Sequence, residues 1–221
     1  MKKENVVEAL FGAGSHFGYS RTRRHPTVTP FLYGNKSGVD IINVEKTAEQ
    51  IEAAKAFLAT LLDSQEKKVL IVGVKPESRE AAQLFANTLR MPFVSERWIG
   101  GTLTNFPQTK KRIAKLEEIR EKKLNGELDK FTKKEKIVIE REMNRLSKYF
   151  SGLVGMTKLP DALIVVDTKK EHTAIKEAKK LRIPVIGIGN TDCPVHMSTF
   201  PIVANDGTTS SIRAILDLLQ K

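Results

Sequence analysis

Three short and almost wholly apolar runs restrict most strongly what this chain can fold into. They cover residues 69–73, 162–167 and 184–188, and a polar residue stands within two positions of both ends of each run. Runs of this length without alternating polar positions are typical of strands buried on both faces. Segments with helical patterning separate the runs, so the strands are expected to lie parallel, with helices on both faces of the sheet. The sequence therefore predicts a doubly wound α/β domain, Rossmann-like or flavodoxin-like.

Further elements complete the predicted domain. Residues 39–42 and 92–94 have the character of strands. Helices are expected at about residues 5–13, 43–62, 76–90, 171–181 and 207–219. Asn43 and Asp206 are the expected N-caps of two of these helices, and Pro76 is expected to open a third.

Residues 106–150 interrupt the alternation of strands and helices. Two runs of apolar residues at three- and four-residue spacing flank the turn signal Asn125–Gly126: Ile113, Leu116 and Ile119, then Ile139, Met143, Leu146 and Phe150. Two antiparallel helices, at about 108–124 and 132–150, would bury these stripes against each other. We expect an inserted antiparallel coiled-coil hairpin at 106–150, and an α/β domain made of residues 1–105 and 151–221.

The net charge of +11 is distributed unevenly. Residues 1–36 carry six basic and two acidic side chains, and residues 106–160 carry fifteen basic and eight acidic ones, whereas the rest is close to neutral. Residues 14–36 contain no acidic side chain and are expected to form a basic N-terminal arm. Concentrated positive charge favours a polyanionic partner such as nucleic acid. The alternatives are a generally basic protein, which would spread the excess, and a solvated hairpin that has no partner.

Motifs that indicate a cofactor or catalysis are missing. The glycines between residues 12 and 18 follow a predicted helix and do not match the dinucleotide spacing G-x-G-x-x-G. The loop from Gly73 to Pro76 lacks the Gly-Lys-Ser/Thr signature of a phosphate-binding loop. Ser15 and His16 are adjacent, which does not make a catalytic triad. We therefore expect no enzymatic activity and no cofactor.

No metal site is assigned from the sequence either. His16, Asp192, Cys193 and Asp206 could converge near the strand ends, but none of them has a compact ligand spacing. A divalent ion near these four residues stays an open alternative. The single cysteine fits a reducing compartment, no apolar run has the length of a membrane span, and the first residues lack the apolar stretch of a secretory signal. The chain is expected to be soluble and intracellular.

Several blocks of residues follow one another in a characteristic order. They are Gly-Ser-His-Phe-Gly at 14–18 with Arg23-Arg24 downstream, Gly-Val-Asp-Ile-Ile-Asn at 38–43 with Lys46-Thr47, Arg-Trp-Ile-Gly-Gly-Thr-Leu-Thr-Asn at 97–105, Pro-Asp-Ala-Leu-Ile-Val-Val-Asp at 160–167, and Ile-Pro-Val-Ile at 183–186. Together they resemble the universal small-subunit ribosomal protein family number two, in its bacterial or organellar form. The likeness runs from about residue 8 to residue 212. The chain departs from the family pattern at His25, at residues 73–75 and at residues 189–194.

The resemblance implies an α/β domain with a protruding coiled-coil hairpin, bound to small-subunit ribosomal RNA near the junction of head and body. It implies a structural role in translation without catalysis. It also implies neighbouring ribosomal proteins as partners, including the largest small-subunit protein, which assists messenger RNA binding. Neither a membrane nor a small-molecule substrate is expected. The location would be the cytoplasmic ribosome, with an organellar ribosome as the alternative.

On this hypothesis, basic side chains contact RNA phosphates from three regions. They are Arg21, Arg23, Arg24 and Lys36 in the arm, Arg97 in the junction before the hairpin, and Lys110, Lys111, Arg112 and Lys115 at the hairpin base. Tyr19 or Tyr33 is a candidate for stacking on RNA, although for Tyr33 a place in the core is favoured. Gly100 and Gly101 are expected to turn the chain into the hairpin, with Trp98 packed at its base.

Two other functions remain as alternatives. The first is a nucleotide-dependent α/β enzyme acting on RNA, which would need polar groups converging at the carboxyl ends of the strands. Lys75, Asp167 and Asn190 are the candidates there, and they form no recognised set. The second is a coiled-coil scaffold that has no role with RNA.

Overall fold

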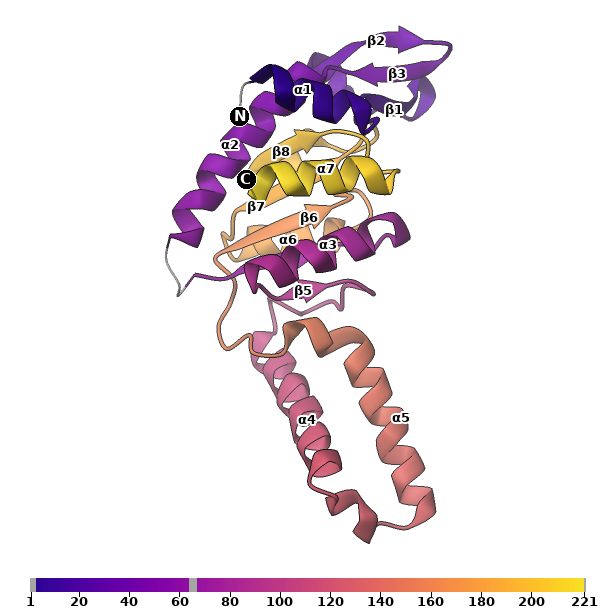
Figure 1. Ribbon diagram of the computed structural model, residues 1–221, viewed down its shortest axis with the longest axis vertical. Coiled ribbons are helices and arrows are strands. Elements are labelled where there is room, and N and C mark those ends of the chain that lie inside the picture. Colours follow the sequence, from indigo (N-terminus) through magenta and orange to yellow (C-terminus); the bar gives the residue numbers. More distant parts are fainter. Residues whose placement is uncertain (1–2, 64–66, 221) are drawn as a thin grey trace.

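The computed structural model describes residues 3–63 and 67–220, and its body is a five-stranded sheet with helices on both sides (Figure 1). All neighbouring strands pair in parallel, in the order β5-β4-β6-β7-β8. The strands are β4 (Val69–Val72), β5 (Phe93–Val94), β6 (Ala162–Val166), β7 (Val185–Gly189) and β8 (Phe200–Val203). The predicted doubly wound α/β fold is therefore confirmed, although β8 was not among the predicted strands.

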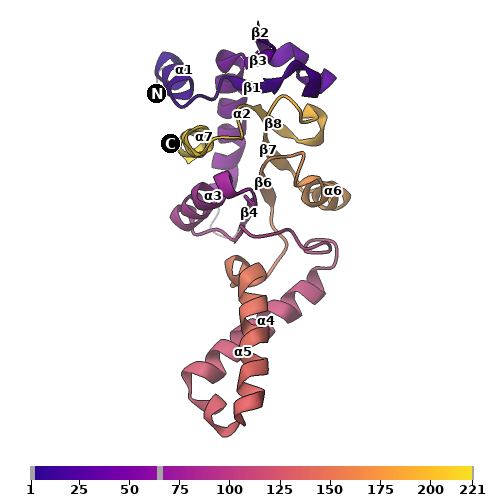
Figure 2. The ribbon, with the colours of Figure 1, turned by 90° about the vertical axis from the view of Figure 1, so that its right-hand side faces the viewer.

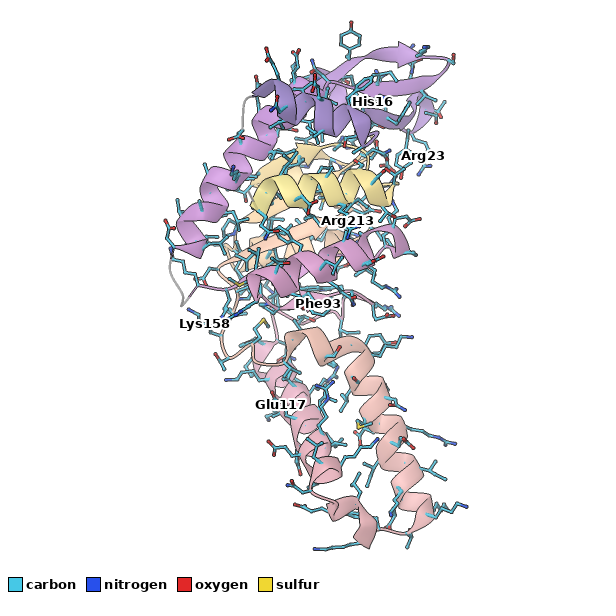
Figure 3. All side chains as sticks on the ribbon, viewed as in Figure 1. His16, Arg23, Phe93, Glu117, Lys158 and Arg213 are labelled. Carbon is cyan, nitrogen blue, oxygen red and sulfur yellow. The ribbon has the colours of Figure 1, made fainter. Side chains whose placement is uncertain are left out.

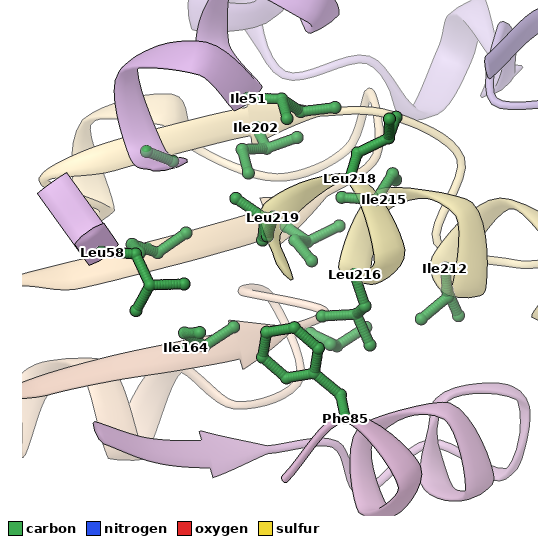
Figure 4. Packing of buried hydrophobic residues seen from close by; sticks show 14 of the residues in the cluster. Ile51, Leu58, Phe85, Ile164, Ile202, Ile212, Ile215, Leu216, Leu218 and Leu219 are labelled. Carbon is green, nitrogen blue, oxygen red and sulfur yellow. The ribbon is translucent and has the colours of Figure 1, made fainter. Parts of the chain in front are cut away.

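Alternate residues of the central strands serve two separate cores, because successive side chains of a strand point to opposite faces. On β4, Ile71 belongs to one core and Leu70 to the other. The first core is covered by α1 (Lys3–Gly12), α2 (Val44–Leu62), α3 (Pro76–Leu89) and α7 (Thr209–Gln220). Figure 4 shows Phe85 of α3 and Leu216 of α7 packed over Ile164 of β6. The second core lies under α6 (His172–Lys180), on the opposite face (Figure 2).

The two helix caps predicted from the sequence have different outcomes. The Asn43 side chain accepts hydrogen bonds from the amides of Glu45 and Lys46, so its predicted cap is confirmed. The cap predicted for Asp206 is wrong: α7 begins at Thr209, and Asp206 is buried beneath Tyr19 instead. Within the described parts of the chain, no helix combines the length and the apolar character that crossing a membrane requires.

Two helices, α4 (Phe106–Leu124) and α5 (Lys133–Phe150), project from the body as a hairpin (Figure 1). They run in opposite directions and cross each other in Figure 2. A capping box between Thr132 and Glu135 starts α5. Leu116 and Phe150 are buried at the base of the hairpin, in the second core. The two antiparallel helices are as predicted, whereas the supercoil of a true coiled coil stays a prediction.

The segment predicted as a basic arm folds, together with the predicted strand at residues 39–42, into a second sheet that was not predicted. Its strands are β1 (Phe17–Ser20), β2 (Leu32–Lys36) and β3 (Val39–Ile42), which pair antiparallel in the order β1-β3-β2. Two 3-10 turns, Arg21–Arg23 and Pro26–Phe31, connect β1 to β2. Figure 1 places this sheet and the hairpin at opposite ends of the long axis of the molecule. The two basic segments are therefore held far apart by the nearly neutral α/β body.

Candidate nucleic-acid interface

Three cations of the small sheet and its turns are exposed: Arg21, Arg23 and Lys36. The guanidinium carbon of Arg23 lies 4.4 Å from the centre of the Tyr19 ring, and its NH2 lies 3.5 Å from a carboxylate oxygen of Asp192. The Arg23 side chain is still 56% exposed, and it lies at the edge toward which the parallel strands point (Figure 3). These cations can meet a phosphate without giving up a strong internal partner.

Arg24 has a different environment from its neighbours. Its Nε donates to one carboxylate oxygen of Asp40 at 2.7 Å, and its NH2 donates to the other oxygen, which also accepts a hydrogen bond from Asn35 at 2.9 Å. Asp40 is fully buried, and the Arg24 side chain is 21% exposed. This paired geometry ties the turn after β1 to β3. The RNA contact of Arg24 stays a prediction, but its guanidinium already serves the fold.

We expect the Arg24–Asp40 pair to make the domain sensitive to acid. The hydrogen bonds from Arg24 hold the pKa of Asp40 below its ordinary value of 3.8. Because the folded-state pKa lies below the unfolded one, this stabilisation is complete above about pH 4 and is lost as the pH falls through the folded value. Asp40→Asn should therefore lower the free energy of unfolding by about 2–3 kcal/mol at pH 7. Urea unfolding followed by circular dichroism should show the difference in unfolding free energy between Asp40→Asn and the unaltered protein narrowing from pH 4 to pH 3. A difference that stays constant over this range would contradict the prediction.

Lys75 joins the small sheet to the strand ends of the large one. Its Nζ lies 3.4 Å from Asp167, 3.5 Å from Asp206, and donates to the Tyr19 hydroxyl at 3.4 Å. The Tyr19 hydroxyl in turn donates to Asp206 at 3.2 Å. Burial alone would lower the pKa of Lys75, but the carboxylates of Asp206 and Asp167 raise it above its usual value. Lys75 therefore stays charged and balances two carboxylates at the carboxyl edge of the sheet.

The residues considered for a metal ion are only partly brought together. Possible ligand atoms of Asp167, Cys193 and Asp206 lie within 4.8 Å of one another, while His16 is stacked between the rings of Phe11 and Phe17. Burial raises the pKa of the Cys193 thiol to about 12, so the thiolate form that binds metals is disfavoured. The ammonium group of Lys75 already faces the two carboxylates of this cluster.

The predicted cations of the hairpin are exposed on the first turns of α4. Lys110 and Lys111 make no ion pair with any described residue. The guanidinium of Arg112 lies 5.9 Å from the centre of the Phe150 ring, and Lys115 reaches across the hairpin to Glu142 at 2.6 Å. The four basic side chains are therefore exposed along the first half of α4, and of them Lys115 has an acidic partner.

A buried carboxylate that sequence reasoning missed organises the junction before the hairpin. Glu177 of α6 accepts hydrogen bonds from Trp98 Nε1 at 3.0 Å and from the amides of Gly101 at 2.8 Å, Leu103 at 3.0 Å and Thr104 at 3.1 Å. Burial pushes its pKa up, but these donors outweigh burial and hold the pKa of Glu177 below its usual value. Trp98 is buried at the hairpin base as expected, and of the two glycines only Gly101 uses the left-handed backbone region, at φ 88°.

The structure places Tyr19, Tyr33 and Arg97 in three different environments. Tyr33 is 82% exposed on β2, so the core position favoured for it is wrong. Tyr19 is partly buried, with one face under Arg23 and its hydroxyl bonded to Asp206. Arg97 is exposed and lines a cavity at the edge of the sheet. Tyr33 is therefore the better stacking platform of the two tyrosines.

Comparison with known proteins agrees with the blocks seen in the sequence. Residues 10–221 match the family model described as ribosomal protein S2. The small ribosomal subunit protein uS2 of Coprothermobacter proteolyticus is 41% identical over 95% of this chain and 78% of its own length. Those of Thermus thermophilus and Karelsulcia muelleri are 37% and 35% identical, over 98% and 96% of this chain and 84% and 96% of their own lengths. The chain therefore belongs to the ribosomal protein S2 family.

Proposed function

We propose that this protein is a structural constituent of the small ribosomal subunit and supports translation by binding small-subunit ribosomal RNA. The observation that carries the proposal is the placement of exposed basic side chains on two projecting elements, in a chain whose relatives are named small ribosomal subunit proteins. Positive charge concentrated on projecting elements is typical of proteins that bind the phosphate backbone of a nucleic acid. Such contacts release counterions, and this release supplies most of the binding affinity.

The hairpin is the first RNA-binding element in this proposal. Residues 106–150 act as an inserted unit carried by the α/β domain of residues 1–105 and 151–221. Lys110, Lys111 and Arg112 contact phosphates from the base of α4, where no described carboxylate pairs with them. Lys115 contributes less, because Glu142 competes for its ammonium group.

The small sheet is the second RNA-binding element. Arg21, Arg23 and Lys36 contact phosphates from its surface, and Tyr33 stacks on an unpaired base. Arg24 acts by holding the sheet in shape through Asp40. Two such elements at opposite ends of the molecule would bridge separate RNA segments, which suits a structural role.

Protein partners in the subunit are also part of the proposal, including the largest small-subunit protein, which docks messenger RNA. An exposed aromatic group next to the small sheet would serve such a contact. Phe11 is 59% and Phe17 49% exposed, and His16 stacks between their rings. Exposed apolar groups of this kind mark contact surfaces. The protein would act on ribosomes, in the cytoplasm if the source is a bacterium.

We propose no enzymatic role. Three charged groups that meet at the strand ends, Lys75, Asp167 and Asp206, pair with one another. A catalytic acid or base must lie within hydrogen-bond distance of its substrate. These groups instead contact one another inside the protein.

A charge-reversal variant of the hairpin tests the proposed function. Lys110→Glu/Lys111→Glu/Arg112→Glu should weaken binding to small-subunit ribosomal RNA and lower the slope of log affinity against log salt by about three, one for each phosphate contact. The matched control reverses three exposed cations of the α/β body, Lys176, Lys180 and Arg213, and should leave the slope nearly unchanged. Filter binding between 50 and 200 mM salt measures both.

Two results would contradict this proposal. One is RNA binding by the unaltered protein that barely depends on salt. The other is sedimentation of the protein in sucrose gradients of cell lysate away from small subunits and ribosomes.

A further inference from the structure

The order of the strands creates a switch point in the large sheet. From β4 the chain moves outward to β5, and it then crosses back to β6 on the other side of β4. The loops that follow β4 and β6 therefore leave the sheet toward opposite faces. In open α/β sheets, ligands bind in the crevice that opens at the carboxyl ends of the strands at such a point.

A cavity of about 650 Å³ lies at this switch point. Its walls come from three segments: the start of α3 with Val74, Pro76 and Arg79, the loop after β5 with Glu96, Arg97, Trp98 and Gly100, and the start of α6 with Lys170, Glu171 and Thr173. This volume falls within the range of small-molecule sites. The cavity adjoins the Lys75 cluster, because Val74 and Pro76 on either side of Lys75 line it, whereas none of the four hairpin cations does.

The entrance of the cavity is positive and unpaired. Arg97 and Lys170 are exposed, and neither makes an ion pair with a described residue. Arg79 is bound to Glu96 at 2.9 Å, yet its Nε is buried without a hydrogen-bond partner. The first turns of α3 and α6 border the cavity, and the dipole at a helix start favours an anion.

The inner wall carries a buried carboxyl group that no protein donor satisfies. Glu171 is 6% exposed and lines the cavity, and its side chain accepts no hydrogen bond within the described residues. Burial raises the pKa of Glu171. The carboxyl group of Glu171 lines the cavity without a protein donor, so a hydroxyl or amine of a ligand can donate to it in place of water.

We propose that this cavity binds one phosphorylated nucleoside. The phosphate would meet Arg97 and Lys170, and a ribose hydroxyl or base amine would meet Glu171. The nucleoside has two sources with the same chemistry, a free nucleotide and an unpaired nucleotide of a single-stranded RNA. The inference goes beyond the ribosomal role, because a free nucleotide needs no ribosome in order to bind.

The only tryptophan of the chain lines the cavity, so its fluorescence reports on binding. Adenosine 5′-monophosphate added to the full-length protein should change the Trp98 emission saturably, and adenosine or inorganic phosphate alone should bind more weakly. Arg97→Ala and Lys170→Ala should each weaken binding about tenfold, as expected for one charge-assisted hydrogen bond. Lys180→Ala, at the far end of α6, is the matched control and should change nothing.

A five-nucleotide single-stranded RNA distinguishes the two sources. If this RNA displaces bound adenosine 5′-monophosphate at a lower concentration than free nucleotide needs, the cavity is assigned to RNA. If it needs a higher concentration, the cavity is assigned to a free nucleotide. The proposal fails if neither ligand gives saturable binding by fluorescence and calorimetry, or if Arg97→Ala and Lys170→Ala both bind as tightly as the unaltered protein. Ribosomal RNA binding that persists in Lys170→Ala, which removes no predicted RNA contact, would leave the proposed function intact, so the two failures can be told apart.

Discussion

Replacing Glu177 by alanine is expected to lower the free energy of unfolding by roughly 3–5 kcal/mol, because a whole hydrogen-bonded loop loses its acceptor. The carboxylate is buried and receives the indole N–H of Trp98 together with the amides of Gly101, Leu103 and Thr104. Without it these donors stay buried without partners, or the loop opens to water. Urea unfolding followed by circular dichroism measures the loss.

Two further variants make the Glu177 prediction specific. Glu177→Gln keeps the shape of the side chain and one carbonyl oxygen, but it turns an NH₂ group toward the amide donors of the loop. The loss of unfolding free energy should therefore be large, although smaller than for Glu177→Ala. Glu118→Ala removes an exposed glutamate of the hairpin, 59% exposed, and should leave the free energy of unfolding nearly unchanged. If Glu177→Ala were no more harmful than Glu118→Ala, the carboxylate would not organise the loop.

The large sheet could be predicted from the sequence because its strands are buried on both faces. All residues of β4, β6 and β7 are buried, and such strands show as apolar runs. The strands of the small sheet give no such signal. β2 exposes four of its five residues, including Tyr33, and its register depends on β3 rather than on a pattern of its own. The basic composition was visible, but the fold of that segment was not.

The same limit applies to the site. Exposed cations such as Arg21, Lys110 and Lys111 follow from composition, because a lysine or arginine without a buried partner stays at the surface. Arg24 and Arg23 are neighbours with the same chemistry, and only the fold gives Arg24 the buried partner Asp40. Glu177 looks like any helical glutamate until the fold brings it to a loop 73 or more residues away.

Replacing Lys75 by methionine is expected to cost about 3–5 kcal/mol of unfolding free energy at pH 7, because two carboxylates lose the cation between them. Lys75 is 17% exposed, and Asp206, one of its partners, is 1% exposed. Methionine has nearly the same length but carries no charge, so Asp167 and Asp206 would repel each other in a site that water barely reaches. Tyr19 would also lose its contact with the ammonium group, which loosens the small sheet.

The pH dependence and a double variant separate this charge effect from a packing effect. Burial already raises the pKa of Asp206, so in Lys75→Met this carboxyl should take up a proton on acidification. The difference in unfolding free energy between Lys75→Met and the unaltered protein should therefore narrow as the pH falls below 7. Lys75→Met/Asp206→Asn should regain part of the loss, because the unpaired buried charge is gone. Lys75 would act only by filling space if two results were found together. The loss of unfolding free energy in Lys75→Met would be independent of pH, and the losses of the two single variants would simply add in the double variant. Lys46→Met, which removes a lysine from the first turn of α2, is a control outside this cluster and should show neither behaviour.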